Sequence, residues 1–313
     1  MNEHQRRLLT AAGLTELRFD APMSECCTLR AGGTAAALID VQSIEELRRL
    51  LALLTDEEIK FLVIGRGSNL LVTDSGYSGA IIRLKGECNA LAVQERGPDF
   101  ALVKAGAGCA LGKLVSWCGG QGLAGLEFLA GIPGSVGGAV RMNAGAWGQE
   151  TGALLFAIEL VDKDGRIRQI SVDALRLSYR NLALADGELG SSILTAAWFR
   201  LTADEPEQIR SRCAAYLERR KGKQPAGAAS AGSFFKNPPG DFAGRLIEAA
   251  GLKGASCGAA MISPVHGNFL VNTGDATAAD ILALAEQVQA EVFARFGIRL
   301  EPEVKIIRDE SCQ

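Results

Sequence analysis

The sequence feature that most constrains the fold is a glycine-rich stretch from residue 122 to residue 148. Eight of its 27 residues are glycine, and only Glu127 and Arg141 carry a charge. Glycine allows positive φ angles and close approach of the backbone to a bound group, at a cost in conformational entropy. We therefore expect residues Gly131 to Gly138 to present N–H groups along an uncharged surface suited to a diphosphate or a flat ring. The alternative is a glycine-rich turn between packed elements.

Length and charge indicate a globular chain of two or three domains. The 313 residues suggest this number at about 100–200 residues per domain. A net charge of −3 gives no long-range attraction to nucleic acid or to an anionic membrane, so neither is an expected partner. The N-terminal segment has no apolar region of signal-peptide length, and no uncharged stretch resembles a membrane span. We therefore expect a cytoplasmic protein.

The cysteines and histidines form no recognisable metal motif. No C-x-x-C pair occurs among the eight cysteines, and His4 and His266 are the only histidines. A metal site is therefore not expected. Adjacent Cys26 and Cys27 could act as a vicinal redox pair, but free thiols are the more common state in a cytosolic protein. The other cysteines are Cys88, Cys109, Cys118, Cys213, Cys257 and Cys312.

Hydrophobic periodicity and turn residues predict a mixture of helices and strands. Ser43 and Glu46 are expected to form a capping box at the start of one helix. Helices are expected in the leader and at 43–54, 111–117, 205–221, 242–250 and 277–296. Strands are expected at 37–41, 61–64, 71–72, 80–84, 101–103, 193–201, 269–271 and 304–307, with a hairpin over 156–170 that turns at 163–165.

A second glycine loop, Gly65 to Leu70, follows the predicted strand 61–64. It is not the dinucleotide fingerprint G-x-G-x-x-G, because Leu70 stands where the third glycine is required. A Walker A loop is also absent, since Gly112-Lys113 is followed by Leu114 rather than serine or threonine. The two glycine loops therefore predict a bound cofactor without indicating phosphoryl transfer.

Seven sequence blocks occur in the order found in one known family. They are IGRGSNLLV, GLEFLAGIPGSVGGAVRMNAGA, YR, AGSFFKNP, AGRLIEAAGLKG, HGNFLVN and LEPEV. From about Thr28 to Ile307 the chain thus resembles the UDP-N-acetylenolpyruvoylglucosamine reductases, flavoenzymes of bacterial peptidoglycan synthesis. The resemblance implies an α+β fold, with a two-domain FAD-binding fold of the vanillyl-alcohol-oxidase-like type and a C-terminal α+β substrate domain. Expected boundaries are 1–86, 87–215 and 216–313, with a C-terminal end that can pack back on the first domain.

The resemblance also implies the reaction. NADPH reduces FAD, and the flavin N5 delivers hydride to the enolpyruvyl group of UDP-N-acetylglucosamine enolpyruvate. A proton then completes the lactyl ether of UDP-N-acetylmuramate. Noncovalent FAD is expected because no histidine lies between His4 and His266 to form a histidyl link. The expected partners are the UDP-sugar and NADPH, and the expected state is a monomer.

The family motifs assign roles to individual residues. Arg180 and Glu303 match the residues that stabilise the aci-enolate, and Ser233 matches the proton donor. The matching substrate-binding positions are Tyr179, Lys223, Asn237 and, more weakly, Lys305. The cofactor-binding positions implied are Gly65, Arg66, Gly67, Ser68, Asn69, Leu70, Gly131, Ile132, Pro133, Gly134, Ser135, Gly137, Gly138 and Asn143.

Other interpretations of these residues stay open. Outside the motif context, Arg180 would be a surface ion-pair partner, Ser233 a turn or cap residue and Glu303 a solvated strand end. His266 can be a hydrogen-bonded structural residue or a substrate contact. Two other functions compete with the reductase. One is an FAD oxidase or dehydrogenase of the same fold that acts on an alcohol or hydroxy acid, and the other is a flavin- or nucleotide-binding module without turnover.

Two positions depart from the family pattern, and one family insertion is missing. Thr34 stands where the family usually has Gly-Gly-Pro, and Leu182 stands where a serine often follows Tyr-Arg. Both departures concern the detail of the pocket rather than the three catalytic positions. No insertion supplies the substrate-capping tyrosine loop of one subgroup, so the sequence indicates the subgroup that lacks it.

Overall fold

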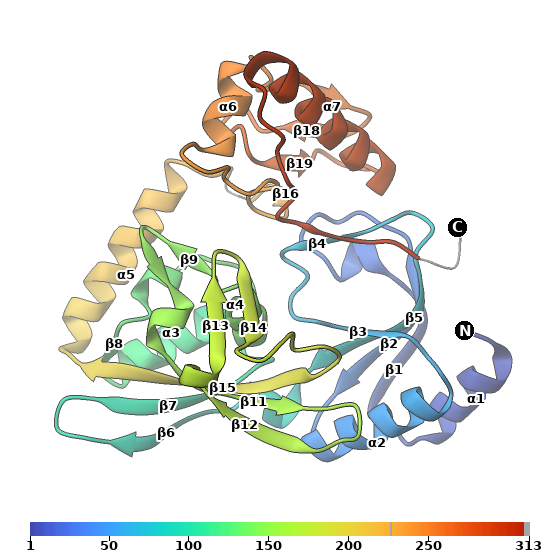
Figure 1. Ribbon diagram of the computed structural model, residues 1–313, viewed down its shortest axis with the longest axis vertical. Coiled ribbons are helices and arrows are strands. Elements are labelled where there is room, and N and C mark those ends of the chain that lie inside the picture. Colours follow the sequence, from blue (N-terminus) through green and yellow to red (C-terminus); the bar gives the residue numbers. More distant parts are fainter. Residues whose placement is uncertain (226, 310–313) are drawn as a thin grey trace. The chain divides into compact units, whose positions relative to one another are not determined.

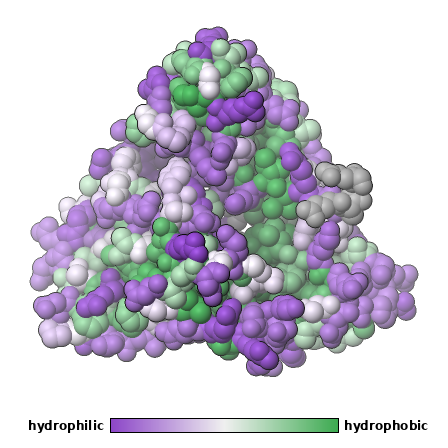
Figure 2. Space-filling view, viewed as in Figure 1, coloured by the Kyte–Doolittle hydropathy of each residue, from purple (hydrophilic) through white to green (hydrophobic). Residues whose placement is uncertain are grey.

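The computed structural model describes residues 1–309 except residue 226. The chain forms two compact units. The first unit comprises residues 1–18, 38–65 and 79–218, and the second comprises 19–37, 66–78 and 219–313. The face shown in Figure 2 is largely hydrophilic, with hydrophobic residues gathered in patches. Among the described residues, no helix has the length and apolar character needed to cross a membrane.

An antiparallel sheet forms the centre of the first unit (Figure 1). Its strands run in the order β12 (Ile167–Ser171), β11 (Leu155–Val161), β15 (Ile193–Ala203), β7 (Ala101–Gly106) and β6 (Leu91–Arg96), and β8 (Leu123–Ala124) also pairs with β15. The predicted hairpin is confirmed, because β11 and β12 pair from Ala157 and Ser171 to Val161 and Ile167. Asp162 closes its turn by accepting hydrogen bonds from the N–H groups of Asp164 and Arg166.

Helices α3 (Leu111–Gly120) and α4 (Val136–Arg141) accompany this sheet, and α4 packs against β15 and β7. The core between these elements is apolar and includes the fully buried Phe128 and Phe199. Helix α4 lies within the glycine-rich stretch and was not among the predicted helices. Close packing on the sheet overcomes the low helix propensity of Gly137 and Gly138.

The first unit also contains helices α1 (Glu3–Ala11) and α2 (Ile44–Asp56), and most of a second sheet. The strand order of that sheet is β1 (Glu16–Pro22), β2 (Thr34–Val41), β5 (Tyr77–Leu84) and β3 (Phe61–Ile64). Strands β3 and β5 are parallel, and α2 lies between β2 and β3 in the chain. Helix α5 (Pro206–Lys221) follows β15 and continues into the second unit.

The capping box predicted for α2 is half correct. Ser43 is the N-cap, and its hydroxyl accepts a hydrogen bond from the N–H of Glu46 at 3.1 Å. The Glu46 carboxylate does not return to Ser43. It accepts instead from the N–H groups of Thr15 and Gln42, both at 2.7 Å. Glu46 therefore ties α2 to the end of β2 and to the segment before β1.

A four-stranded sheet and two helices make up most of the second unit. The strands run in the order β16 (Ala229–Ser230), β19 (Leu270–Asn272), β18 (Ala260–Ile262) and β17 (Ser256–Cys257). Helix α7 (Ala278–Phe296) packs on β17, β18 and β19, and α6 (Ala243–Ala249) packs on α7. Asp74 accepts hydrogen bonds from the first two N–H groups of α7. A parallel pair of β4 (Leu70–Val72) and β20 (Lys305–Ile307) joins distant parts of the chain in this unit.

Several short elements were not predicted. They are β1, β6, β8, the hairpin of β13 (Leu175–Ser178) and β14 (Asn181–Leu184), the pair β9 (Gly145–Ala146) and β10 (Gln149–Glu150), and strands β16 to β18. Most of these strands have four residues or fewer, which gives too few positions for alternation to be visible. The predicted division into 1–86, 87–215 and 216–313 stays a prediction.

Replacing Glu46 with alanine is expected to lower the free energy of unfolding by about 3 kcal/mol, because two N–H groups lose a charged acceptor in a buried site. Glu45→Ala on the same helix is the matched control. It removes only an exposed pair with Arg48, worth about 0.5 kcal/mol. Urea denaturation of both variants measures the difference, and equal losses would contradict the role of Glu46.

Candidate active site

In the first unit, the first residue of one predicted cofactor loop, Gly65, meets Ser135 of the other. A Cβ atom placed on Gly65 would lie 2.2 Å from the hydroxyl oxygen of Ser135, so only glycine allows this approach. Gly137 packs similarly, since a Cβ atom there would lie 2.9 Å from the side chain of Ala107. The structure therefore brings the end of β3 together with the segment Gly131–Gly138, as expected if the two loops share one ligand.

The segment before α4 keeps some of its backbone donors unpaired. Ser135 is the N-cap of α4, and its hydroxyl accepts from the N–H of Gly138 at 3.3 Å. Gly137 donates its N–H to the Ala107 carbonyl at 2.8 Å. Within the described part of the chain, the N–H groups of Gly134 and Ser135 donate to no protein group. Ser135 is buried, so an external acceptor is needed there, and a diphosphate oxygen has the required chemistry.

The continuation of the first glycine loop lies in the second unit. Gly67 has a φ of 64°, and a Cβ atom on it would lie 2.0 Å from the carbonyl oxygen of Cys26. Its own carbonyl accepts the N–H of Thr28 at 3.0 Å. The N–H groups of Arg66 and Gly67 have no acceptor among the described residues. These donors match the predicted role of this loop at a cofactor.

Asn143 connects the glycine-rich stretch to the hairpin β13–β14. It is 1% exposed and has a φ of 41°. Its amide nitrogen donates to the carboxylate of Glu150 at 2.8 Å and to the carbonyl of Ser178 at 3.2 Å, and its amide oxygen accepts from the N–H of Gly152 at 2.8 Å. All three bonds go to protein, so the side chain positions neighbouring segments. Direct cofactor binding by Asn143 stays a prediction.

Tyr179 and Arg180 form the two-residue turn of that hairpin, since Ser178 and Asn181 are the last paired residues. Arg180 has a φ of 58°, which is costly for a residue with a side chain and is common at functional sites. Its guanidinium carbon lies 4.7 Å from the centre of the Tyr179 ring, and Tyr179 is 44% exposed. The turn thus presents a cation beside an accessible aromatic ring in the first unit.

The segments that contain Ser233 and Glu303 meet in the second unit. Phe234, the neighbour of Ser233, accepts the N–H of Glu303 on its carbonyl at 2.8 Å. The amide of Asn69 donates to the Glu303 carbonyl at 3.2 Å, and the Asn69 carbonyl accepts from the N–H of Lys305 at 3.0 Å. Backbone bonds therefore join residues 69, 234 and 303, which lie far apart in sequence. Two predicted catalytic positions and one predicted cofactor position form one cluster.

Asn268 is the residue at this cluster that the sequence analysis did not identify as functional. It is 2% exposed, and its carbonyl accepts the N–H of Phe234 at 2.8 Å. Its side-chain amide accepts the N–H of Phe235 at 2.9 Å and donates to the Phe235 carbonyl at 2.8 Å. The side-chain amide thus bonds both backbone groups of Phe235, as a paired strand would, and so fixes the backbone after Ser233. The only sequence signal was its place in the block HGNFLVN.

His266 is hydrogen-bonded to Asn268. Its Nδ1 atom accepts the N–H of Asn268 at 3.1 Å, so the proton of the neutral ring is on Nε2. The ring packs on Phe269, with 5.0 Å between ring centres. Burial lowers the pKa of His266, opposed by the carboxylate of Glu248. These contacts favour a structural role for His266 over a substrate contact.

Three of the predicted substrate-binding residues, Asn237, Lys223 and Lys305, lie in the second unit. Asn237 is exposed, and its amide oxygen accepts from the N–H of Ala243 at 3.1 Å, which caps α6. Lys223 is exposed just after α5. Lys305 is exposed at the start of β20, whereas Glu303 precedes that strand. The roles of Asn237, Lys223 and Lys305 stay predictions.

The buried cysteines have the properties of inert thiols. Burial raises the pKa of Cys27 and Cys109, and it raises the pKa of Cys88 and Cys118 to about 12. Thiols with such pKa values are poor nucleophiles at neutral pH. Cys312 lies outside the described residues. Among the described residues, no group of three or more His, Cys, Asp or Glu side chains could hold a metal ion.

Replacing Asn268 with alanine is expected to leave the N–H and carbonyl of Phe235 without partners in a buried site. The free energy of unfolding should fall by about 3 kcal/mol, since each unsatisfied group costs about 1–3 kcal/mol. Ser256→Ala, at an exposed position of β17, should change it by less than about 0.5 kcal/mol. Denaturant titration of both variants tests this, and a near-neutral Asn268→Ala would refute the bracing role.

Comparison with known proteins agrees with this arrangement of loops and clusters. The family described as FAD binding domain matches residues 35–171. The family described as UDP-N-acetylenolpyruvoylglucosamine reductase, C-terminal domain, matches residues 224–307. The first match contains the glycine segment Gly131–Gly138, and the second contains Ser233, Asn268 and Glu303. The predicted α+β fold, with an FAD-binding region followed by a C-terminal domain, is confirmed.

Full-length relatives carry the same description. The UDP-N-acetylenolpyruvoylglucosamine reductase of Geotalea uraniireducens is 44% identical over 307 residues, covering 98% of this chain and 99% of the relative. UDP-N-acetylenolpyruvoylglucosamine reductase 2 of Symbiobacterium thermophilum is 40% identical over 306 residues, covering 98% and 96%. The crystal structure of the reductase from Thermus caldophilus aligns with a TM-score of 0.79 and 40% identity, over 93% of this chain and 98% of that one. The chain therefore belongs to the UDP-N-acetylenolpyruvoylglucosamine reductase family.

Proposed function

We propose that this protein reduces the enolpyruvyl group of UDP-N-acetylglucosamine enolpyruvate to the lactyl ether of UDP-N-acetylmuramate, with NADPH as hydride donor and FAD as cofactor. The observation that carries the proposal is the cluster of the Ser233 segment with Glu303 and Asn69, in a region that matches the C-terminal domain of the reductases. An FAD oxidase of the same fold has no reason to carry this constellation. The product makes the protein a contributor to peptidoglycan precursor synthesis.

The cofactor would be held by backbone groups rather than by charged side chains. The N–H groups of Gly134 and Ser135 in the first unit, which have no acceptor in the described part of the chain, suit diphosphate oxygens. The same holds for those of Arg66 and Gly67 in the second unit. When bound, FAD supplies the capacity to take a hydride from NADPH and to pass it to the enolpyruvyl carbon. The absence of a histidine between His4 and His266 supports noncovalent binding.

The three proposed catalytic side chains, Arg180, Glu303 and Ser233, would stabilise the charge that hydride addition creates and supply the proton. Hydride addition places negative charge on the substrate carboxylate, as an aci-enolate. The Arg180 guanidinium would hold that charge with its fork of N–H donors, and Glu303 as the protonated acid would donate a further hydrogen bond. The Ser233 hydroxyl would then give its proton to the adjacent carbon, a transfer that a strongly basic carbanion favours.

The other substrate contacts are proposed from the motif matches alone. Tyr179 lies beside Arg180 in the same turn and is accessible to a ligand. The exposed amines of Lys223 and Lys305 suit the diphosphate of a UDP-sugar, and Asn237 suits a sugar or amide oxygen. The cytoplasmic location and the monomeric state also remain part of this proposal.

The reaction is tested by following the flavin spectrum of the purified protein under anaerobic conditions. NADPH should bleach the oxidised flavin band, and the enolpyruvyl UDP-sugar should restore it with formation of UDP-N-acetylmuramate. A control with UDP-N-acetylglucosamine should not restore the band, because it has no double bond to accept hydride. A reduced flavin that stays bleached with the enolpyruvyl substrate but reoxidises with oxygen would support the oxidase alternative instead.

Ser233→Ala is expected to leave reduction of the flavin by NADPH within about twofold, and to slow its reoxidation by substrate about 10²–10⁴-fold. Ser233→Cys keeps a proton donor at the same place and should recover part of that rate. Stopped-flow measurement of the two half-reactions separates the effects. Equal slowing of both halves would assign Ser233 a structural role.

A further inference from the structure

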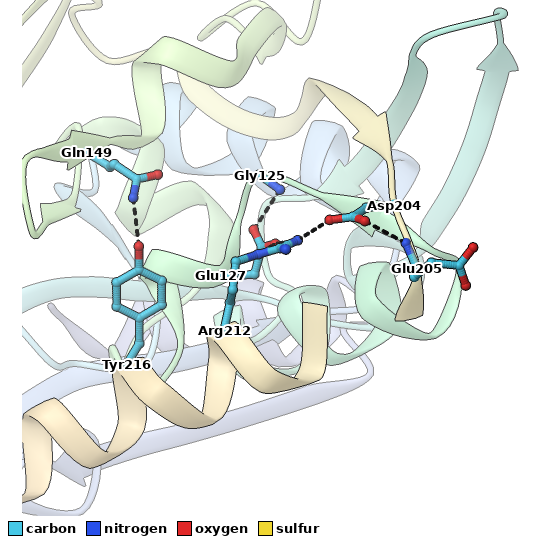
Figure 3. Close-up of polar contacts among 7 residues, drawn as sticks. All are labelled: Gly125, Glu127, Gln149, Asp204, Glu205, Arg212 and Tyr216. Carbon is cyan, nitrogen blue, oxygen red and sulfur yellow. Dashed lines mark hydrogen bonds and ion pairs between the residues drawn. The ribbon is translucent and has the colours of Figure 1, made fainter. Parts of the chain in front are cut away.

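A charged network lies in the first unit, where α5 meets the glycine-rich stretch (Figure 3). Glu127 is only 6% exposed, and one of its carboxylate oxygens accepts from Arg212 Nε at 3.0 Å and Nη2 at 2.8 Å. The same Nη2 atom donates to Asp204 at 2.6 Å, and this bond lowers the pKa of Asp204. One arginine of α5 thus holds a buried carboxylate of the glycine-rich stretch and a carboxylate at the end of β15.

The other carboxylate oxygen of Glu127 acts on the backbone next to it. It accepts the N–H of Gly125 at 2.6 Å, where the chain has a φ of 128°. Glu127 also begins the short 3₁₀ helix η3 (Glu127–Leu129), and its carbonyl accepts the N–H of Ala130 at 2.9 Å. The next residue is Gly131, the first of the predicted flavin loop. Glu127 therefore fixes the conformation in which the chain enters that loop.

A groove of about 340 Å³ lies beside the network, but its polar side chains are occupied with one another. Gln149 donates its amide to the hydroxyl of Tyr216 at 2.8 Å, and Arg212 is shared between its two carboxylates. Figure 3 shows these side chains directed at partners within the protein. A positioning role for the network therefore fits the geometry better than a second ligand site.

We infer that Arg212 is a positioning residue for the flavin, because through Glu127 it sets the start of the loop Gly131–Gly138. The inference rests on the proposed role of that loop in FAD binding. A buried carboxylate that loses its cation is strongly unfavourable, so without Arg212 the 3₁₀ helix η3 would shift to hydrate Glu127. Only Ala130 separates η3 from the loop, and the shift would displace the backbone donors that follow.

The test measures FAD affinity rather than turnover. Apoprotein carrying Arg212→Met should bind FAD about tenfold more weakly in a fluorescence titration, the change that corresponds to 1.4 kcal/mol. Arg210→Met is the matched control, because Arg210 lies on the same helix and its ion-pair partner among the described residues is the exposed Glu207. Its FAD affinity should stay within about twofold of the unmodified protein, as expected for a surface pair.

A double-mutant cycle shows whether Arg212 acts through Glu127. Glu127→Gln should weaken FAD binding by itself, and adding Arg212→Met should then cost far less than in the unmodified protein. Arg212→Lys, which keeps the charge, should recover part of the affinity and serves the same test if Arg212→Met does not fold. Unchanged FAD affinity in these variants, or fully additive losses, would overturn the inference. A protein that binds FAD as expected but fails to reduce the enolpyruvyl sugar would instead overturn only the proposed function.

Discussion

The predicted cofactor loops depend on close contacts between the backbone at three glycines and neighbouring residues. Gly65 can approach Ser135, and Gly67 can approach Cys26, only because neither glycine has a Cβ atom. Gly137 meets the side chain of Ala107 in the same way. Any larger residue would push the loops from their neighbours and move the N–H groups that they present. The glycines thus have a steric role in addition to the conformational freedom for which they are usually noted.

In the second unit, hydrogen bonds join short segments that are far apart in sequence. The segment after Ser233 has few residues of regular structure, so its backbone groups need partners from elsewhere. The Asn268 side chain bonds both the N–H and the carbonyl of Phe235, and the N–H of Glu303 bonds the carbonyl of Phe234. Together these bonds bring the segment that contains Ser233 next to the segment that contains Glu303. Precise placement here follows from satisfying buried backbone groups.

Elements with a strong repeating pattern could be predicted from the sequence. Strand β3 was predicted with its observed bounds, and the hairpin β11–β12 and helix α7 were close to theirs. The hairpin β13–β14 was missed because its strands have four residues each, and its turn uses Arg180 at positive φ where glycine or asparagine is usual. Sequence periodicity carries no information on such a strained turn. The motif match nevertheless assigned a catalytic role to Arg180, and that role stays a prediction; residues at positive φ are common at functional sites.

The contacts of buried polar side chains could not be predicted, because they depend on which distant segments meet. Glu46 was expected to return to its own N-cap, but it accepts from Thr15 and Gln42 instead. Asn268 gave no local sign that it would pair with Phe235, since an amide in a short strand-like block is compatible with many environments.

The charges of the glycine-rich stretch illustrate the same limit. The sequence showed that Glu127 is one of only two charged residues in that stretch, but it did not show which groups its carboxylate contacts. In the structure its carboxylate is directed at Arg212 and Gly125, where it supports the chain just before the loop. The predicted flavin loop itself is uncharged, so its backbone N–H groups would bind a diphosphate without a competing carboxylate. Glu127 and Arg212 lie outside the loop Gly131–Gly138. They can therefore hold the start of the loop in place while the loop itself stays neutral.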